Sequence, residues 1–195
     1  GKMDLALEFM EYAKNEALEE IFSSPIMTSM FAFSTRYQNC VPRNISYRAT
    51  LYKHFMHILA LREIEKNDEF LSDTNSIHKL KKCWQDISWI MYHYRIKLVL
   101  LHVSELEYQL IQKGHTKSII RQAIIGLVNI NEKSNEVTSL LHETMLEYLL
   151  ASYGIQQMLA AGDELNIFME CNLASDVSAF VKEIWKQLEY NELDI

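Results

Sequence analysis

The sequence has few of the residues that make tight turns. It holds only five glycines and two prolines among 195 residues, and it contains no Asn-Gly or Asp-Gly pair. A sheet protein of this length needs many tight turns, and those turns favour such residues. Long helices with few connections are therefore expected, and the sequence predicts an all-α fold.

Cysteine and long apolar runs are also scarce. Cys40, Cys83 and Cys171 are isolated and odd in number, which argues against a disulfide framework and against a zinc knuckle. Reduced thiols are typical of a cytosolic compartment. No uncharged apolar run reaches the roughly 20 residues that span a bilayer. We therefore expect a cytoplasmic protein without a membrane span.

Motifs of the common catalytic and cofactor sites are missing as well. The chain has no G-x-x-x-x-G-K-[ST], G-x-G-x-x-G or G-x-S-x-G motif, and neither E-x-x-H nor H-E-x-x-H occurs. These motifs serve nucleotide binding, nucleophilic catalysis and metal binding. The sequence thus indicates no cofactor and no metal, and it favours a protein that is not an enzyme.

Charge is unevenly distributed along the chain. The net charge is −7, but basic residues outnumber acidic ones in 43–121, and acidic residues dominate 163–195. A nucleic-acid-binding protein usually has a stronger basic excess. Nucleic acid is therefore not the favoured partner, although the basic middle could attract phosphate or an acidic protein.

Apolar residues recur at helical spacing over most of the chain. The expected helices are 4–21, 24–37, 45–66, 76–112, 117–130, 133–161, 164–172 and 176–190. Ser24 with Pro25, and Thr116, are expected to begin helices, and Gly114 is expected to end one. We expect a single all-helical domain over 1–195, a bundle of seven or eight helices, with 1–42 as a peripheral N-terminal segment in an alternative reading.

The helix expected at 76–112 is the centre of this bundle. On a helical wheel, residues 86–110 present two apolar faces separated by two polar strips. A helix that is apolar on two faces is covered on both. Leu98 lies on one of these faces, so Leu98→Asp is expected to unfold the domain.

Arg95 and His102 share one polar strip of this expected helix as R-x6-H. This spacing resembles the R-x4-6-H signature of the HEPN ribonucleases, which are small helical bundles that cleave RNA. The resemblance implies that His102 acts on the 2′-hydroxyl or the leaving oxygen and that Arg95 stabilises the charge on phosphorus. Ile96 follows Arg95, where the family usually has a polar residue. The alternative is that both residues only separate the buried faces.

Segment 26–33 is rich in methionine and phenylalanine. Met27, Met30, Phe31 and Phe33 form an interaction surface if they are exposed, because Met and aromatic residues are enriched at interfaces; if they are buried, they belong to the core. The sequence favours a non-enzymatic interaction or regulatory domain whose partner is another protein or a second copy. The alternatives are a HEPN-like ribonuclease using Arg95 and His102, and a carrier of an apolar ligand within the bundle.

Overall fold

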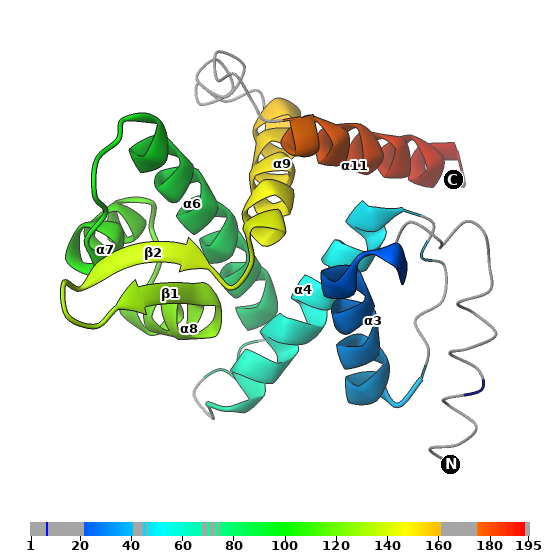
Figure 1. Cartoon of the computed structure of the whole chain (residues 1–195), viewed down its shortest axis with the longest axis horizontal. Helices are drawn as coiled ribbons and strands as arrows, with labels where there is room; N and C mark the ends of the chain where they lie inside the picture. The colour runs from blue at the N-terminus through cyan, green and yellow to red at the C-terminus, as the bar shows by residue number, and fades with distance from the viewer. Residues whose placement is uncertain are drawn as a thin grey trace. The chain divides into compact units, whose positions relative to one another are not determined.

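The computed structural model describes most of the chain. The described residues are 7, 22–40, 45, 47–67, 70, 73, 75–160 and 175–193. They form seven helices and one two-stranded sheet (Figure 1). The all-α prediction is confirmed. The helix expected at 164–172, and nearly all of the one expected at 4–21, lie outside the described residues.

The chain divides into two compact units, residues 1–59 and 60–195. The expectation of a single domain, with 1–42 as a peripheral segment, stays a prediction.

The first unit contains α3 (Pro25–Gln38) and most of α4 (Arg48–Glu65). Ser24 precedes α3 as its N-cap and Pro25 occupies the first helical position, as predicted. The ring of Phe33 on α3 meets that of Phe55 on α4 edge-on, with 5.6 Å between the ring centroids. This contact joins the two helices within the unit.

The second unit is built around α6 (Ser76–Ile96). This helix packs against α7 (Val103–Gln112), α8 (Lys117–Leu127) and α9 (Glu143–Ala160), and α9 also packs against α11 (Ser175–Leu193). Eleven residues of α6 are buried, all of them at or before Met91. Among them is Trp84, whose indole Nε1 donates a hydrogen bond of 3.1 Å to the carbonyl of Ala123 on α8. The predicted central position is therefore confirmed for 76–91.

The single helix expected over 76–112 is two helices. Helix α6 ends at Ile96, and Leu98 adopts the left-handed conformation with φ of 54°. Leu98 is exposed to 92%, so its predicted place in the core is wrong and Leu98→Asp is not expected to unfold the unit. The helical wheel failed because it assumed that the helix continues, and a break at 97 changes the direction of every later side chain.

A β-hairpin takes the place of the end of one expected helix, 117–130, and the start of the next, 133–161. Strand β1 (Val128–Asn131) pairs antiparallel with β2 (Glu136–Leu140), with Val128 opposite Leu140. Asn135 provides the left-handed position of the turn, with φ of 54°, which is a conformation that asparagine tolerates. The expected helix 117–130 therefore ends at Leu127, and the one expected at 133–161 begins only at Glu143.

Candidate interaction surface

Arg95 and His102 do not lie on one helix. Arg95 is in the last turn of α6, whereas His102 is the N-cap of α7 and is exposed. The guanidinium of Arg95 donates to both carboxylate oxygens of Glu143 at the start of α9, and its Nη2 lies 3.2 Å from Oε2. The hydrogen bond to Glu143 raises the pKa of Arg95. The predicted shared face is thus wrong, while a catalytic role for the two residues stays a prediction.

The methionine- and phenylalanine-rich segment of α3 is mostly covered. Met27, Met30 and Phe31 are buried. Phe33 is half-buried, and its ring stacks at 6.3 Å from that of Tyr37. This burial agrees with the core alternative for the segment. Its use as an interaction surface stays a prediction.

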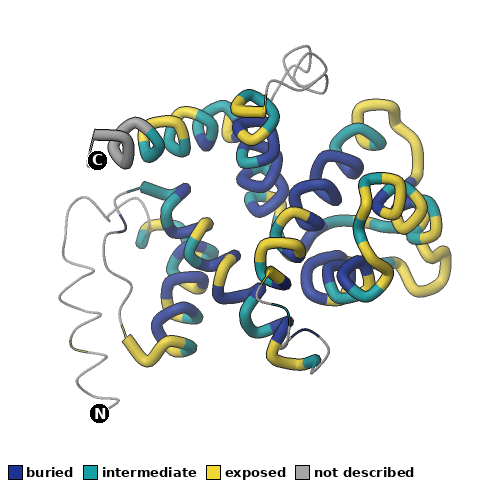
Figure 2. The backbone as a smooth tube through the Cα atoms, turned by 180° about the vertical axis from the view of Figure 1, so that it is seen from behind, coloured by how far each residue is buried: buried dark blue, intermediate teal, exposed yellow. Residues whose placement is uncertain are grey.

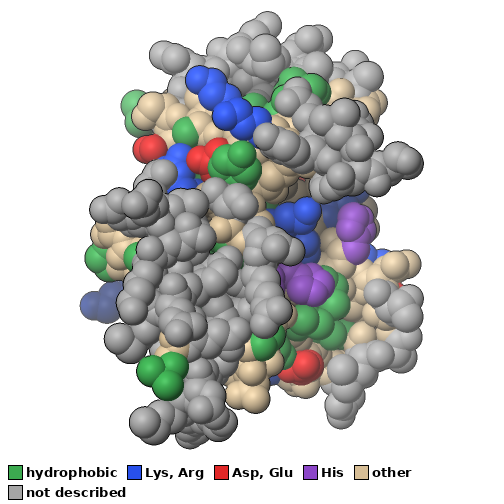
Figure 3. All heavy atoms as spheres, turned by 90° about the vertical axis from the view of Figure 1, so that its right-hand side faces the viewer, with side chains coloured by type: hydrophobic (Ala, Val, Ile, Leu, Met, Phe, Trp, Pro, Cys, Tyr) green, Lys and Arg blue, Asp and Glu red, His purple; other side chains and the backbone are tan. Residues whose placement is uncertain are grey.

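Among the described residues of the second unit, the most exposed apolar segment lies where α6 ends. We call residues 96–100 the apolar loop. Its four hydrophobic side chains are exposed to 53% at Ile96, 92% at Leu98, 54% at Val99 and 67% at Leu100. Figure 2 shows this connection between α6 and α7 in yellow. On the face in Figure 3, by contrast, the hydrophobic side chains that can be seen lie in separate groups among polar ones.

The backbone of the apolar loop begins with a Schellman cap. The Val99 N–H donates to the Tyr94 carbonyl and the Leu98 N–H donates to the Arg95 carbonyl, both at 3.1 Å. This pattern places Leu98 at the left-handed position, where glycine is usual because a side chain is strained there. The sequence therefore has an exposed leucine at a position that favours glycine.

Two backbone hydrogen bonds hold the C-terminal end of the apolar loop in place. The Leu101 carbonyl accepts a hydrogen bond of 2.8 Å from the Val137 N–H, and the Val103 N–H donates to the Asn135 carbonyl at 3.1 Å. These bonds attach the end of the loop to the hairpin. The exposed side chains are therefore presented by a connection of fixed geometry.

A side-chain network joins the two helices that flank the loop. The Tyr94 hydroxyl on α6 donates to Glu105 Oε1 on α7 at 3.2 Å, and Gln109 Nε2 donates to Tyr94 Oη at 2.9 Å and to Glu105 Oε1 at 2.8 Å. Burial, and then the Glu105 carboxylate, raise the pKa of Tyr94. Tyr94 therefore keeps its proton at neutral pH, and the network fixes the end of α6 against the start of α7.

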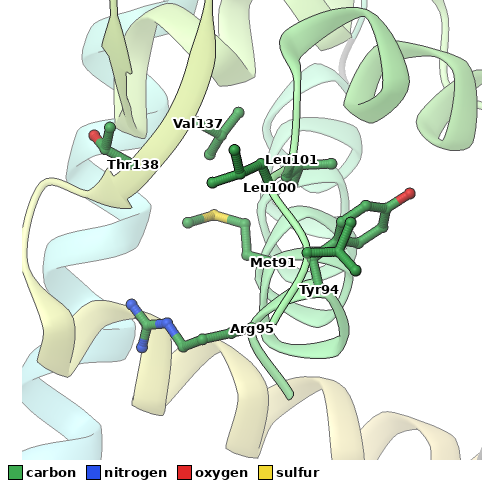
Figure 4. A pocket seen from close by; sticks show the side chains of 8 residues that line it. Met91, Tyr94, Arg95, Leu100, Leu101, Val137 and Thr138 are labelled. Carbon is green, nitrogen blue, oxygen red and sulfur yellow. The ribbon is translucent and has the colours of Figure 1, made fainter. Parts of the chain in front are cut away.

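A small pocket opens beside the apolar loop. Its volume is about 120 Å³, below the roughly 300–1,000 Å³ that is usual for small-molecule sites. Figure 4 shows Met91 of α6, Leu100 of the loop and Val137 of β2 pointing towards one another, while the Tyr94 ring points away from them. Arg95 and Thr138 also line the pocket, so a space of this size suits one side chain of a partner that is mainly apolar.

The loop also carries a charge. Lys97 is exposed between Ile96 and Leu98, and it forms no ion pair with any residue in the described part of the chain. The backbone N–H and carbonyl of Leu100 likewise make no hydrogen bond to a described residue. The surface therefore offers apolar side chains, a cation without an ion-pair partner among the described residues, and backbone groups that make no hydrogen bond to those residues. No signal in the sequence separates these exposed residues from buried ones.

None of the helices within 22–40, 47–67, 75–160 and 175–193 combines the length and the apolarity needed to cross a bilayer. The described side chains include no group of three or more His, Cys, Asp or Glu residues that could hold a metal ion.

Comparisons with protein-family models, curated proteins and solved structures found no match to this chain.

Proposed function

We propose that this chain is a non-enzymatic interaction domain that binds a partner protein through the apolar loop at residues 96–100. The observation that carries the proposal is Leu98, an almost fully exposed leucine in a left-handed conformation. Exposure of apolar groups and backbone strain both cost free energy in the isolated chain. Burial of the side chain by a partner recovers the first of these costs.

The partner that fits this surface is a protein segment with an apolar anchor and an acidic side chain. The apolar anchor enters the pocket between Met91, Leu100 and Val137. The acidic side chain pairs with Lys97, which has no carboxylate partner among the described residues. Anchors of this kind supply most of the binding energy at protein interfaces, and charges set the specificity.

A second copy of the chain fits this surface less well. Two loops facing each other around a two-fold axis bring their Lys97 side chains together, and like charges oppose such contacts. Free thiols at the exposed Cys40 and the buried Cys83 support a cytoplasmic setting for the partner, because thiols are kept reduced there.

The test compares capture of partners by matched variants of the full chain. Leu98→Asp and Leu100→Asp place a carboxylate in the loop. Ile125→Asp introduces a carboxylate at a residue of α8 whose exposure of 65% matches the 67% of Leu100. All three variants are expected to melt like the unmodified chain. Proteins captured from lysate by the unmodified chain and by Ile125→Asp are expected to be missing from the Leu98→Asp and Leu100→Asp samples.

A photo-crosslinking residue introduced at position 98 identifies what touches the loop. A crosslink to another protein is the expected result. Equal capture by all variants would overturn the proposal. A crosslink between two copies of the chain would also overturn it, because the loop would then serve self-association.

A further inference from the structure

A second pocket lies at the turn between α7 and α8. It has a volume of about 300 Å³ and eight lining residues. Three of these are lysines and two are histidines, and no carboxylate lines it. The basic lining residues are His78, Lys79, Lys82, Lys113 and His115. The pocket therefore concentrates basic side chains within one unit.

The described carboxylates that pair with the basic lining residues leave an excess of positive charge. Asp73 pairs with Lys79 at 2.6 Å. The buried Asp86 is 2.7 Å from Nε2 of His115 and 3.4 Å from Nζ of Lys113. Lys82 is exposed and has no carboxylate partner in the part of the chain that the structure describes. An anion in the pocket would therefore meet at least one lysine that none of the described carboxylates neutralises.

The first turn of α8 adds hydrogen-bond donors. Thr116 lines the pocket and is the N-cap, and its hydroxyl accepts from the Ile119 N–H at 3.5 Å. The N–H groups of Lys117 and Ser118 make no hydrogen bond to a described residue. Free N–H groups at the positive end of a helix dipole favour an anion. The space beside Gly114 is open, since a Cβ added there would meet nothing within 4 Å.

We propose that this pocket binds a phosphate group, carried by a small molecule or present as the free ion. Lysines and helix N-terminal amides are among the groups that hold phosphate in proteins. The volume is at the lower end of the range for small-molecule sites, about 300–1,000 Å³, so a phosphate with a short organic group fits. The pocket does not involve the apolar loop, and the inference is independent of the proposed partner.

Calorimetric titration of the full chain tests the site, with inorganic phosphate and phenyl phosphate as probes and sodium chloride at matched ionic strength as the reference. Saturable binding of at least one probe is expected at concentrations up to about 10 mM, which covers millimolar dissociation constants. Tighter binding of phenyl phosphate assigns the site to a phosphate monoester, and tighter binding of inorganic phosphate assigns it to the free ion.

Variants of matched charge locate the binding. Lys82→Gln is expected to weaken phosphate binding about tenfold, as the loss of one charge-assisted hydrogen bond implies. Lys133→Gln removes the same charge in the exposed turn of the hairpin and is expected to change the affinity less than about twofold. Lys113→Gln is a second pocket variant, and thermal melting verifies that each variant is folded. Absence of saturable binding, or an equal loss with Lys133→Gln, would overturn the inference.

Discussion

The ends of α6 and α7 provide a prediction with a control inside the same molecule. Both helices end in the same Schellman pattern, with Leu98 at the left-handed position of the first and Gly114 at that of the second. The φ angles are 54° and 87°. Because only glycine adopts this conformation without strain, Leu98→Gly is expected to raise the free energy of unfolding.

The size of the effect follows from three contributions. A left-handed conformation costs a residue with a Cβ about 1–2 kcal/mol. The greater freedom of glycine in the unfolded chain offsets about 0.5–1 kcal/mol of that gain. Leu98 is exposed to 92%, so loss of its side chain sacrifices only about a tenth of the 1.5–3 kcal/mol that a buried leucine contributes. The expected net stabilisation is about 0.5 kcal/mol.

Gly114→Ala is the reverse experiment. An added Cβ meets no atom within 4 Å, so the substitution introduces backbone strain without a clash. It is expected to destabilise the unit by about 1 kcal/mol.

Urea unfolding followed by circular dichroism measures both changes, and the slope of the transition reveals any change in the unfolded state. A Leu98→Gly variant that loses more than about 1 kcal/mol would refute the reasoning. Such a loss would mean that Leu98 is packed against the rest of the unit.

Two further predictions concern the buried carboxylate of Glu63. A Cβ at Gly126 would lie 2.9 Å from Glu63 Cγ, so Gly126→Ala is expected to displace the Glu63 side chain. Lys66, Arg62 and Gln122 hold this side chain by hydrogen bonds. The substitution is therefore expected to lower the free energy of unfolding, measured in urea, by about 1–2 kcal/mol. In a Glu63→Ala background the same change should instead stabilise the helix by up to about 1 kcal/mol, and identical effects in both backgrounds would show that the two residues do not touch. Burial raises the pKa of Glu63, but the hydrogen bonds from Lys66 and Arg62 together lower it by more than burial raises it. The pKa of Glu63 is therefore below its ordinary value. The folded state therefore favours the charged carboxylate, and the resulting stability is present near neutral pH and is lost as the pH falls below about 4.3. Between about pH 5 and pH 3, the melting temperature of Glu63→Gln should fall less steeply than that of the unmodified chain.

Helix ends with a strong local signal were predictable from the sequence. Pro25 begins α3, Thr116 caps α8, and Gly114 follows α7 in the left-handed conformation, all as expected. Each signal depends on the conformational preference or hydrogen bonding of a single residue within one turn. Such a signal does not depend on contacts with residues far away in the sequence, which explains why these boundaries were predicted correctly.

The hairpin at 128–140 was missed although the sequence contains a signal for it. Val128 and Ile130 alternate with asparagines in β1, and Val137 and Thr138 are the β-branched residues of β2. Such residues favour strands. The sequence lacks the Asn-Gly pair that is typical of a tight turn, but Asn135 alone provides the left-handed position. A four-residue turn requires less of the sequence than a two-residue turn does.

The break after α6 could not be predicted because its causes are distant in the sequence. Arg95 contacts Glu143, Leu101 bonds to Val137, and no residue near position 97 is a helix breaker. Helix propensity favours continuation through Leu98, so the tertiary contacts on both sides of the break must outweigh it. These contacts account for the change of chain direction but not for the presence of leucine at position 98. Glycine would adopt the same backbone conformation with less strain. Folding stability alone thus gives no reason for an exposed apolar side chain at this position, whereas burial by a partner does.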